Sequence, residues 1–169
     1  MPKKIFEKPD FKDYNIQSEY DKLCHFLASK NMAPSENIIE QIKSGDIIEI
    51  YSYPENIQIY SNSEFRKICS YSIEQMTTIP FTQLFWRDDK IHNDIIKQSN
   101  LACSDKNLSA RSWNIDNHEI IESLHPRKRT FEMSMGLVCP CIDKSTKAVS
   151  CFISTVTVNF IFEWADDIS

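Results

Sequence analysis

Glycine is almost absent from this chain of 169 residues, which contains only Gly45 and Gly136. The phosphate-binding loops of nucleotide-binding proteins need several glycines within a few residues, because the backbone must approach the phosphate groups closely. Two glycines that lie far apart in the sequence cannot form such a loop. The sequence therefore excludes ATP or dinucleotide binding through a glycine-rich motif.

Long apolar runs and an excess of positive charge are also missing. No apolar run reaches the roughly 20 residues of a membrane-spanning helix, and the start, MPKKIFEKPDFKD, lacks the apolar centre of a secretory signal. The net charge of −5 argues against broad binding to nucleic acid or to an anionic membrane. We therefore expect a cytoplasmic protein that has neither nucleic acid nor a membrane as a partner.

The chain has the length and composition of a single compact domain, since 41% of its residues are hydrophobic. Its six cysteines could pair in an oxidising compartment. Without a secretory signal, we expect them to stay reduced.

Residues 1–45 are expected to form a polar arm and a helical extension. Residues 1–15 show no sustained period, whereas the apolar residues of 18–30 fall at i, i+3, i+4 and i+7, which places them on one helical face. These residues are Tyr20, Leu23, Cys24 and Leu27. A second short helix is predicted over 35–43, with Ser35 as its cap.

From residue 46 onward, the period changes to that of extended chain and short helices. Residues 46–53 and 57–60 are rich in β-branched and aromatic side chains and predict a hairpin around Pro54-Glu55-Asn56. Short helices are predicted at 63–69 and 72–76, and a longer helix at 92–103.

The last third of the chain predicts strands. Residues 130–137 alternate between apolar and polar side chains, so one face of that strand is apolar. Residues 148–162 carry apolar side chains on both faces, and such a strand must be covered on both sides. The helix at 18–30, or a second subunit, would cover the outer face. The order of elements indicates an α+β fold with one antiparallel sheet.

The run IQIYSNSEFRKICSYSIEQM, followed by TIPFTQLFWRDDK, resembles the PAS sensory domain. That family has an Asn after a strand, a helix with a Phe, a Gly-Tyr or Gly-Phe step, a Glu-Glu-Leu-like turn and a later hydrophobic-basic-Asp-Asp segment. The matching positions are Asn62, Phe65, Ser70-Tyr71, Glu74-Gln75-Met76 and Leu84 to Asp89. Ser70 departs from the family's glycine, so this helix must end without a positive φ.

The resemblance implies a PAS-like five-stranded antiparallel sheet over residues 46–163, with short helices on one face. Such domains bind a small molecule or carry a signal through dimer contacts. Kinase, cyclase and DNA-binding regions do not fit into 169 residues. We therefore expect a stand-alone, non-enzymatic sensor or interaction module that acts in trans, as a homodimer or on a separate signalling protein.

We expect the ligand to lie in the cup formed by the sheet. Met133 and Met135 would line the cavity, because methionine adapts to an apolar guest, while Arg111 and Trp113 would lie at its mouth. The expected ligand-binding residues are Phe65, Tyr71, Phe85, His92, Arg111, Trp113, Met133 and Met135. The sequence leaves the identity of the ligand open.

Two coloured cofactors, flavin and haem, are candidates for binding in this cup. The reactive-cysteine motif of flavin-binding LOV domains has no counterpart around Cys69 or Cys103, which argues against a flavin-cysteinyl adduct. Haem-binding PAS domains use a histidine on the long helix, and His92 lies at or before the start of that helix. A histidine at a helix start is more often a surface or capping group, so the cofactor stays unknown.

Cys139, Cys141 and Cys151, with His118 or His125, could supply four zinc ligands if a hairpin brought Cys151 beside the other two. The Cys-x-Cys spacing is tighter than the usual Cys-x-x-Cys. Buried thiols near a strand end are the preferred interpretation, and we predict no metal site.

Two further functions remain as alternatives. A small cup-shaped α+β enzyme could use His118, Glu119 or His92 as acid-base groups. Asp88-Asp89 is a weaker candidate, because adjacent carboxylates seldom converge on one substrate. The third alternative is a protein-binding factor with a filled core and no ligand.

Overall fold

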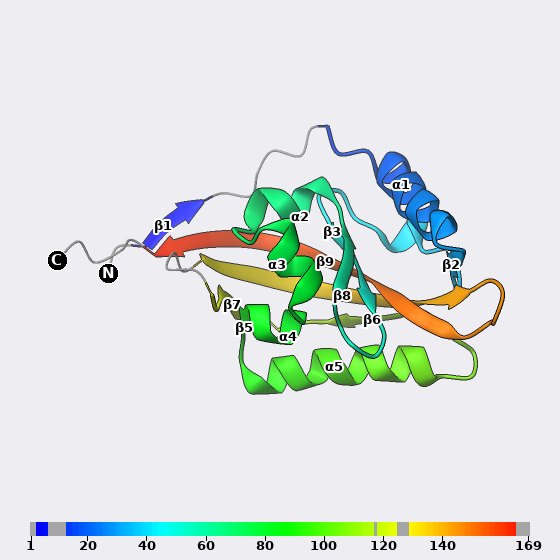
Figure 1. The fold of residues 1–169 in the computed structure, drawn as a ribbon. Helices are drawn as coiled ribbons and strands as arrows, with labels where there is room; N and C mark the ends of the chain where they lie inside the picture. Colours follow the sequence, from blue (N-terminus) through cyan, green and yellow to red (C-terminus); the bar gives the residue numbers. More distant parts are fainter. Residues whose placement is uncertain (1–2, 7–12, 117, 125–128, 165–169) are drawn as a thin grey trace.

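The structure, a computed structural model, describes residues 3–6, 13–116, 118–124 and 129–164, with the backbone alone at 3–6, 68, 119, 129–135 and 159–164. Its strands are β1 (Lys3–Phe6), β2 (Met32–Pro34), β3 (Ile47–Ser52), β4 (Gln58–Ser61), β5 (Phe85–Trp86), β6 (Arg111–Asn114), β7 (Glu119–Glu122), β8 (Arg129–Asp143) and β9 (Val149–Trp164). Its helices are α1 (Ile16–Ser29), the 3-10 turn η1 (Ile39–Gln41), α2 (Ser63–Ile68), α3 (Ile73–Thr78), α4 (Phe81–Leu84) and α5 (Asp89–Ser104). Figure 1 shows one sheet between α1 and α5.

The long hairpin of β8 and β9 forms the centre of the sheet, and short strands line both of its outer edges. Along β9, β3 pairs with residues 151–156 and β1 with residues 161–164. Along β8, strands β7, β6 and β2 follow one another end to end. All of these pairs are antiparallel, so the predicted α+β class is confirmed.

Nine strands join this sheet in the described part of the chain, whereas five were expected. Five positions do lie across the sheet, in the order β4, β3, β9, β8 and β7, and the two-residue β5 extends the edge beyond β7. The additional strands arise because β8 and β9 are longer than the strands beside them. β1 belongs to the segment expected to be a loose arm, and it pairs with the end of β9 that β3 does not reach.

Helix α1 covers one face of the sheet, as its apolar period predicts. Asn15 begins the helix, since its side chain accepts a hydrogen bond of 2.9 Å from the Ser18 N–H. Leu23 and Leu27 are fully buried, in one cluster with Ile48, Ile50, Cys139 and Ile153 of the sheet. Helix α1 therefore covers Cys151 and Ile153 on the outer face of the doubly apolar strand β9.

The predicted helix over 35–43 is wrong, since this segment holds only the turn η1. The Ser35 N–H donates to the Pro140 carbonyl at 2.8 Å, which holds the backbone in line with β2 at the sheet edge. The turn is initiated instead by Asn37, whose side-chain oxygen accepts from the Ile39 N–H at 3.0 Å. Ile38 and Ile42 are buried nevertheless.

The PAS-like segment forms the two short predicted helices. The buried Asn62 links β3 to α2, since its Oδ1 accepts from the Ile48 and Phe65 N–H groups at 3.1 and 3.4 Å. Its Nδ2 donates to the Asp46 carbonyl at 3.0 Å. Helix α2 ends at Cys69 in extended backbone, and Ser70 has no positive φ. Serine therefore fits where the family has glycine.

Helix α5 begins three residues before the predicted start at His92. Asp88 is its N-cap, and its Oδ1 accepts from the Lys90 and Ile91 N–H groups at 3.0 and 3.3 Å. Asp88, weighed above as a weak acid-base candidate, therefore has a structural role as a helix cap. No helix in the described ranges is long and apolar enough to cross a membrane.

Candidate functional site

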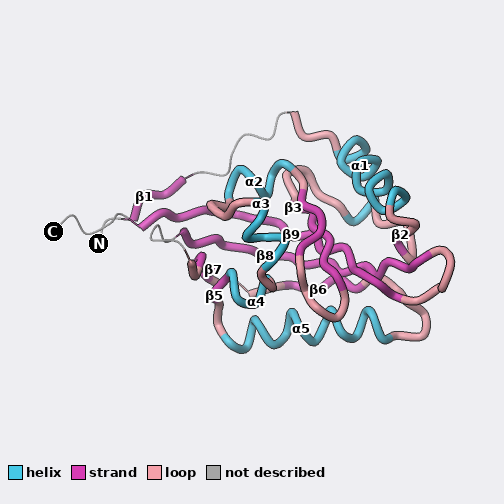
Figure 2. The backbone as a smooth tube through the Cα atoms, viewed as in Figure 1, coloured by secondary structure: helices cyan, strands magenta, loops and turns pink. Residues whose placement is uncertain are grey.

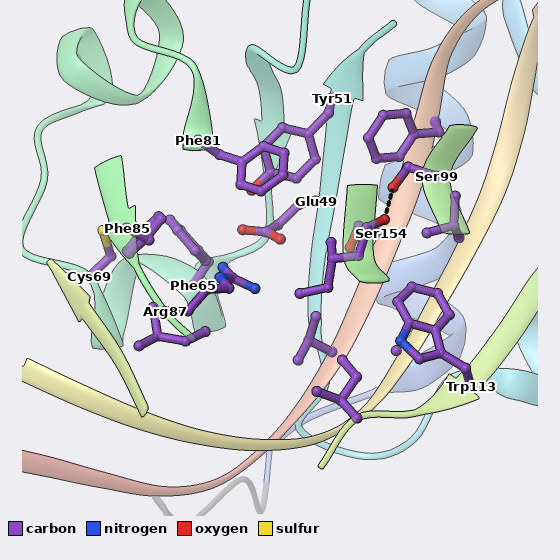
Figure 3. A pocket seen from close by; sticks show the side chains of 17 residues that line it. Glu49, Tyr51, Phe65, Cys69, Phe81, Phe85, Arg87, Ser99, Trp113 and Ser154 are labelled. Carbon is purple, nitrogen blue, oxygen red and sulfur yellow. Dashed lines mark hydrogen bonds between the residues drawn. The ribbon is translucent and has the colours of Figure 1, made fainter. Parts of the chain in front are cut away.

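A cavity of about 60 Å³ lies between the sheet and helices α2, α4 and α5 (Figure 3). Its aromatic wall consists of Tyr51, Phe65, Phe81, Phe85, Trp113 and Phe152. Its aliphatic wall consists of Ile95, Ile115, Ile120, Val138 and Val156. The polar side chains on the lining are those of Glu49, Cys69, Arg87, Ser99 and Ser154. The site is thus an apolar chamber with a few polar groups.

Strand alternation decides which side chains reach the cavity. On β3, Ile48 and Ile50 pack under α1, so the intervening Glu49 points to the opposite face. On β9, Ile153 packs under α1 and Phe152 and Ser154 line the cavity. The sheet is therefore the shared wall between the cavity and α1. Figure 2 shows the backbone of the sheet between α1 and α5.

The aromatic rings contact one another around the cavity. Tyr51 lies 4.9 Å from Phe81 and 5.7 Å from Phe152, measured between ring centroids. Phe85 contacts Phe65 edge-on, with centroids 6.3 Å apart. Such contacts connect β3, β9 and the short helices into one wall.

Glu49 and Arg87 form the charged part of the cavity. Glu49 is 6% exposed, and one carboxylate oxygen accepts from the Gln58 amide at 3.0 Å. Burial raises the pKa of Glu49 to about 7, although the bonds to Tyr51 and Gln58 and the positive charge of Arg87 act against it. Figure 3 shows the Arg87 guanidinium close to the Glu49 carboxylate. The buried Arg87 Nε has no hydrogen-bond partner among the described residues.

Gly136 allows Trp113 to close one side of the cavity. A Cβ atom at this position would lie 3.0 Å from Trp113 Cζ2 and 2.9 Å from Ile115 Cδ1. Both distances are tighter than ordinary van der Waals contact, so a side chain here would displace the indole or Ile115. The glycine is needed for this close approach.

Three of the predicted ligand-binding residues line the cavity, namely Phe65, Phe85 and Trp113. Tyr71 lies behind the wall, where its ring contacts Phe85 at 5.5 Å and its hydroxyl donates to the Leu84 carbonyl. The role predicted for these residues is to bind a ligand, and that role stays a prediction.

The remaining predicted residues lie elsewhere or outside the described side chains. His92 is half-buried on the first turn of α5 and does not line the cavity. Arg111 Nε donates to Gln98 Oε1 of α5 at 3.0 Å, which turns the guanidinium away from the lining. Met133 and Met135 pair with β9 through their backbone, and their side chains lie outside the described residues.

Sequence reasoning missed Glu49, Arg87 and Ser154. One signal was present, because a glutamate in the middle of DIIEIYSY is unusual for a buried strand. Arg87 was assigned only to the hydrophobic-basic-Asp-Asp segment. Ser154 gave no signal, since a serine among β-branched residues fits either face of a strand.

The cysteine cluster lies on the α1 face of the sheet, away from the cavity. Cys139 and Cys141 point to the same side, as predicted. Cys151 lies opposite Cys141 in the backbone pairing of β8 with β9, and both are free thiols. Burial raises the pKa of the Cys139 thiol. His125 lies outside the described residues, and within the described ranges no three potential ligands are placed to hold a metal ion.

The acid-base candidates do not converge on the cavity. His118 Nδ1 lies 2.8 Å from the Asp116 carbonyl, and burial lowers the pKa of its imidazole. The Glu119 side chain lies outside the described residues. The neighbouring Glu122 is 1% exposed and accepts from the Ser70 N–H at 2.8 Å, so this carboxylate fixes the break between α2 and α3.

The fold of the chain resembles that of solved structures. The fold is similar to a sensory box sensor histidine kinase from Vibrio cholerae, with a TM-score of 0.47 and 12% sequence identity over 84% of this chain and 97% of that one. No protein-family model and no curated protein matches the chain.

Proposed function

We propose that the chain is a stand-alone PAS-like sensor module, without enzymatic activity, that binds a small molecule in the cavity and acts in trans through its own dimer or a partner protein. The observation behind this proposal is the chamber itself, which combines aromatic walls with the buried Glu49 and with Arg87, whose Nε atom is buried. Buried charged groups are costly to a fold unless they are paired or used.

The size of the cavity limits the guest. Pockets for drug-sized ligands measure roughly 300–1,000 Å³, whereas this cavity measures about 60 Å³. Since one water needs about 10–15 Å³ on a comparable measure, the space suits a guest of a few heavy atoms. Haem and flavin would require a large rearrangement of the aromatic wall.

The shared sheet offers a route for the signal. A guest that moves Glu49 or Ser154 acts on strands whose next residues, Ile48 and Ile153, pack against Leu23 and Leu27 of α1. The guest would then favour one arrangement of α1 over another, which is a population shift. A dimer partner or signalling protein would recognise the altered α1 surface.

The test is to follow amide and methyl NMR signals of the full chain while small neutral and charged molecules of four to six heavy atoms (~60 Å³ of space) are added. We expect shifts at the cavity residues and, more weakly, at Leu23 and Leu27 of α1. A Ser154→Leu variant fills the cavity and should abolish both effects. Ser109→Leu, in the exposed loop before β6, is the matched control and should respond as the unmodified chain does.

The proposal would be contradicted if no molecule shifts the cavity signals. It would also fail if the shifts persist in Ser154→Leu, because the guest would then be bound elsewhere.

A further inference from the structure

Arg87 places an unused hydrogen-bond donor inside the cavity. Its Nε is buried and has no partner in the described part of the chain, and the guanidinium points toward the chamber (Figure 3). A buried donor without an acceptor is expensive, and more so when it is charged. An acceptor supplied by a guest would remove this cost. The planar guanidinium fork fits a carboxylate better than it fits a single oxygen.

Glu49 faces the same space and would repel an anion while it is ionised. Protonation removes this repulsion and turns the carboxyl group into a hydrogen-bond donor. The pKa of Glu49, raised to about 7 mainly by burial, makes both forms available near neutral pH. When Glu49 takes up one proton from solvent, its carboxyl group and the Arg87 guanidinium can both donate hydrogen bonds to an anion in the cavity.

The polar groups that share the cavity with Glu49 or bond to it come from several elements. They are Tyr51 of β3, Gln58 of β4, Cys69 after α2, Arg87 after β5, Ser99 of α5 and Ser154 of β9. Burial raises the pKa of Cys69 to about 12 and that of Tyr51 well above its ordinary value, so both stay protonated.

Two histidines and one carboxylate lie in the second layer. Burial, together with the nearby charge of Arg87, lowers the pKa of His92 and of His118, so both imidazoles stay neutral at pH 7. Glu122 lies behind Cys69, with one oxygen bound to the Ser70 N–H. The pKa of Glu49, about 7, therefore lies at the centre of the range between pH 6 and 8, whereas both histidines lose their charge at a lower pH than an ordinary imidazole does.

We propose that the cavity binds a short-chain monocarboxylate, with its carboxylate between the Arg87 guanidinium and the protonated Glu49 and its alkyl group against the aromatic wall. Where Glu49 is ionised before binding, as at pH 8, one proton enters from solvent with each carboxylate; where it is already protonated, as at pH 6, almost none does, and no O–H bond other than that of Glu49 forms. The ligand class follows from Arg87 as the single cation on the described part of the lining, the titratable carboxyl group of Glu49 and a volume that admits only a few carbons. This inference rests on the proposed function, because it names the guest of the same cavity.

The experiment is isothermal titration of the full chain with propionate and with the neutral propionamide, at pH 6 and pH 8 and constant ionic strength. Because Glu49 must be protonated in the complex, propionate should bind about tenfold more weakly at pH 8 than at pH 6. Buffers of different ionisation enthalpy should show uptake of close to one proton per propionate at pH 8.

Two variants separate the roles of the charged groups. Glu49→Gln keeps a donor without a titratable proton, so propionate should still bind, with equal affinity at both pH values. Arg87→Met should weaken propionate at least tenfold while propionamide binding changes little. Arg66→Met removes an exposed arginine and is the matched control. Circular dichroism of each variant shows whether it folds.

The outcomes distinguish the two proposals. If propionamide binds as well as propionate, or propionate affinity does not depend on pH, the carboxylate assignment is wrong. The proposal that the cavity binds a small molecule would still hold. If neither molecule nor any other small guest binds, both proposals fail. Loss of pH dependence in Glu49→Gln with retained binding is the result that only the proton-coupled site gives.

Discussion

Glu49 should make the free energy of unfolding depend on pH in an unusual direction. Its pKa is about 7 in the folded chain, against an ordinary value of 4.5 that applies once the chain unfolds. Between these values the folded state holds a proton that the unfolded state has released. The contribution of Glu49 to stability is thus fully present below about pH 4.5 and is lost as the pH rises through 7.

The size of the effect follows from the same two values. Since a tenfold change in proton affinity is worth about 1.4 kcal/mol, ionising Glu49 costs the folded state about 3 kcal/mol above pH 8. Other carboxylates add their own pH dependence, so the useful quantity is the difference from a Glu49→Gln variant. Relative to the unmodified chain, that variant should gain about 2.5 kcal/mol of stability between pH 5 and pH 8.5.

Urea unfolding at half-unit steps from pH 5 to 8.5 measures this difference. Glu55→Gln, in the exposed turn between β3 and β4, is the matched control and should follow the unmodified chain within about 0.5 kcal/mol throughout. Parallel curves for Glu49→Gln and the unmodified chain would refute the reasoning, because they would show that Glu49 titrates normally and is not held in a dry cavity.

Three other outcomes are expected. Asn62→Ala should lower the free energy of unfolding by about 2–3 kcal/mol, because the buried Ile48 N–H loses its acceptor and α2 loses its cap. The exposed Asn100→Ala is the control and should change this free energy by less than about 0.5 kcal/mol. Equal urea midpoints for the two variants would contradict the expectation. Deleting residues 1–34 should expose the sheet face under α1 and cause self-association by light scattering, and a stable, unchanged monomer would refute the proposed role of that face. Ser70→Gly should destabilise the chain by up to about 1 kcal/mol, because no positive φ requires glycine there and the unfolded chain gains freedom; a rise in melting temperature would count against the extended helix end.

Local signals in the sequence predicted the elements that local interactions determine. The apolar stripe of α1, the β3–β4 hairpin and the helix break at Ser70 depend on residues near each other in the chain, and each was found within a few residues of its actual bounds. The segment 35–43 shows the limit, because the hydrogen bond from Ser35 to Pro140 of β8, far away in the sequence, continues the pairing of β2 into a segment that has a helical pattern.

The cavity was only partly predictable for a similar reason. Phe65 and Phe85 belong to the motif that resembles the PAS domain, so they could be proposed in advance. Glu49 could be assigned to the cavity only once α1 was known to cover Ile48 and Ile50. The place of Ser99 on the cavity lining depends on the rotation of α5 about its axis against the sheet, and no sequence period specifies this rotation to within one residue.

The central hairpin also has a consequence for the order in which the protein folds. The turn between β8 and β9 is closed locally, since Asp143 accepts hydrogen bonds from the Ser145 and Thr146 N–H groups at 2.8 and 2.9 Å. By contrast, β3 pairs with a strand about 100 residues further along the chain, and loop closure over such a distance is slow. We expect the hairpin to form before the transition state and the cavity after it. Substitutions in the turn should then slow refolding, while substitutions of Glu49 or Tyr51 should act mainly on the unfolding rate.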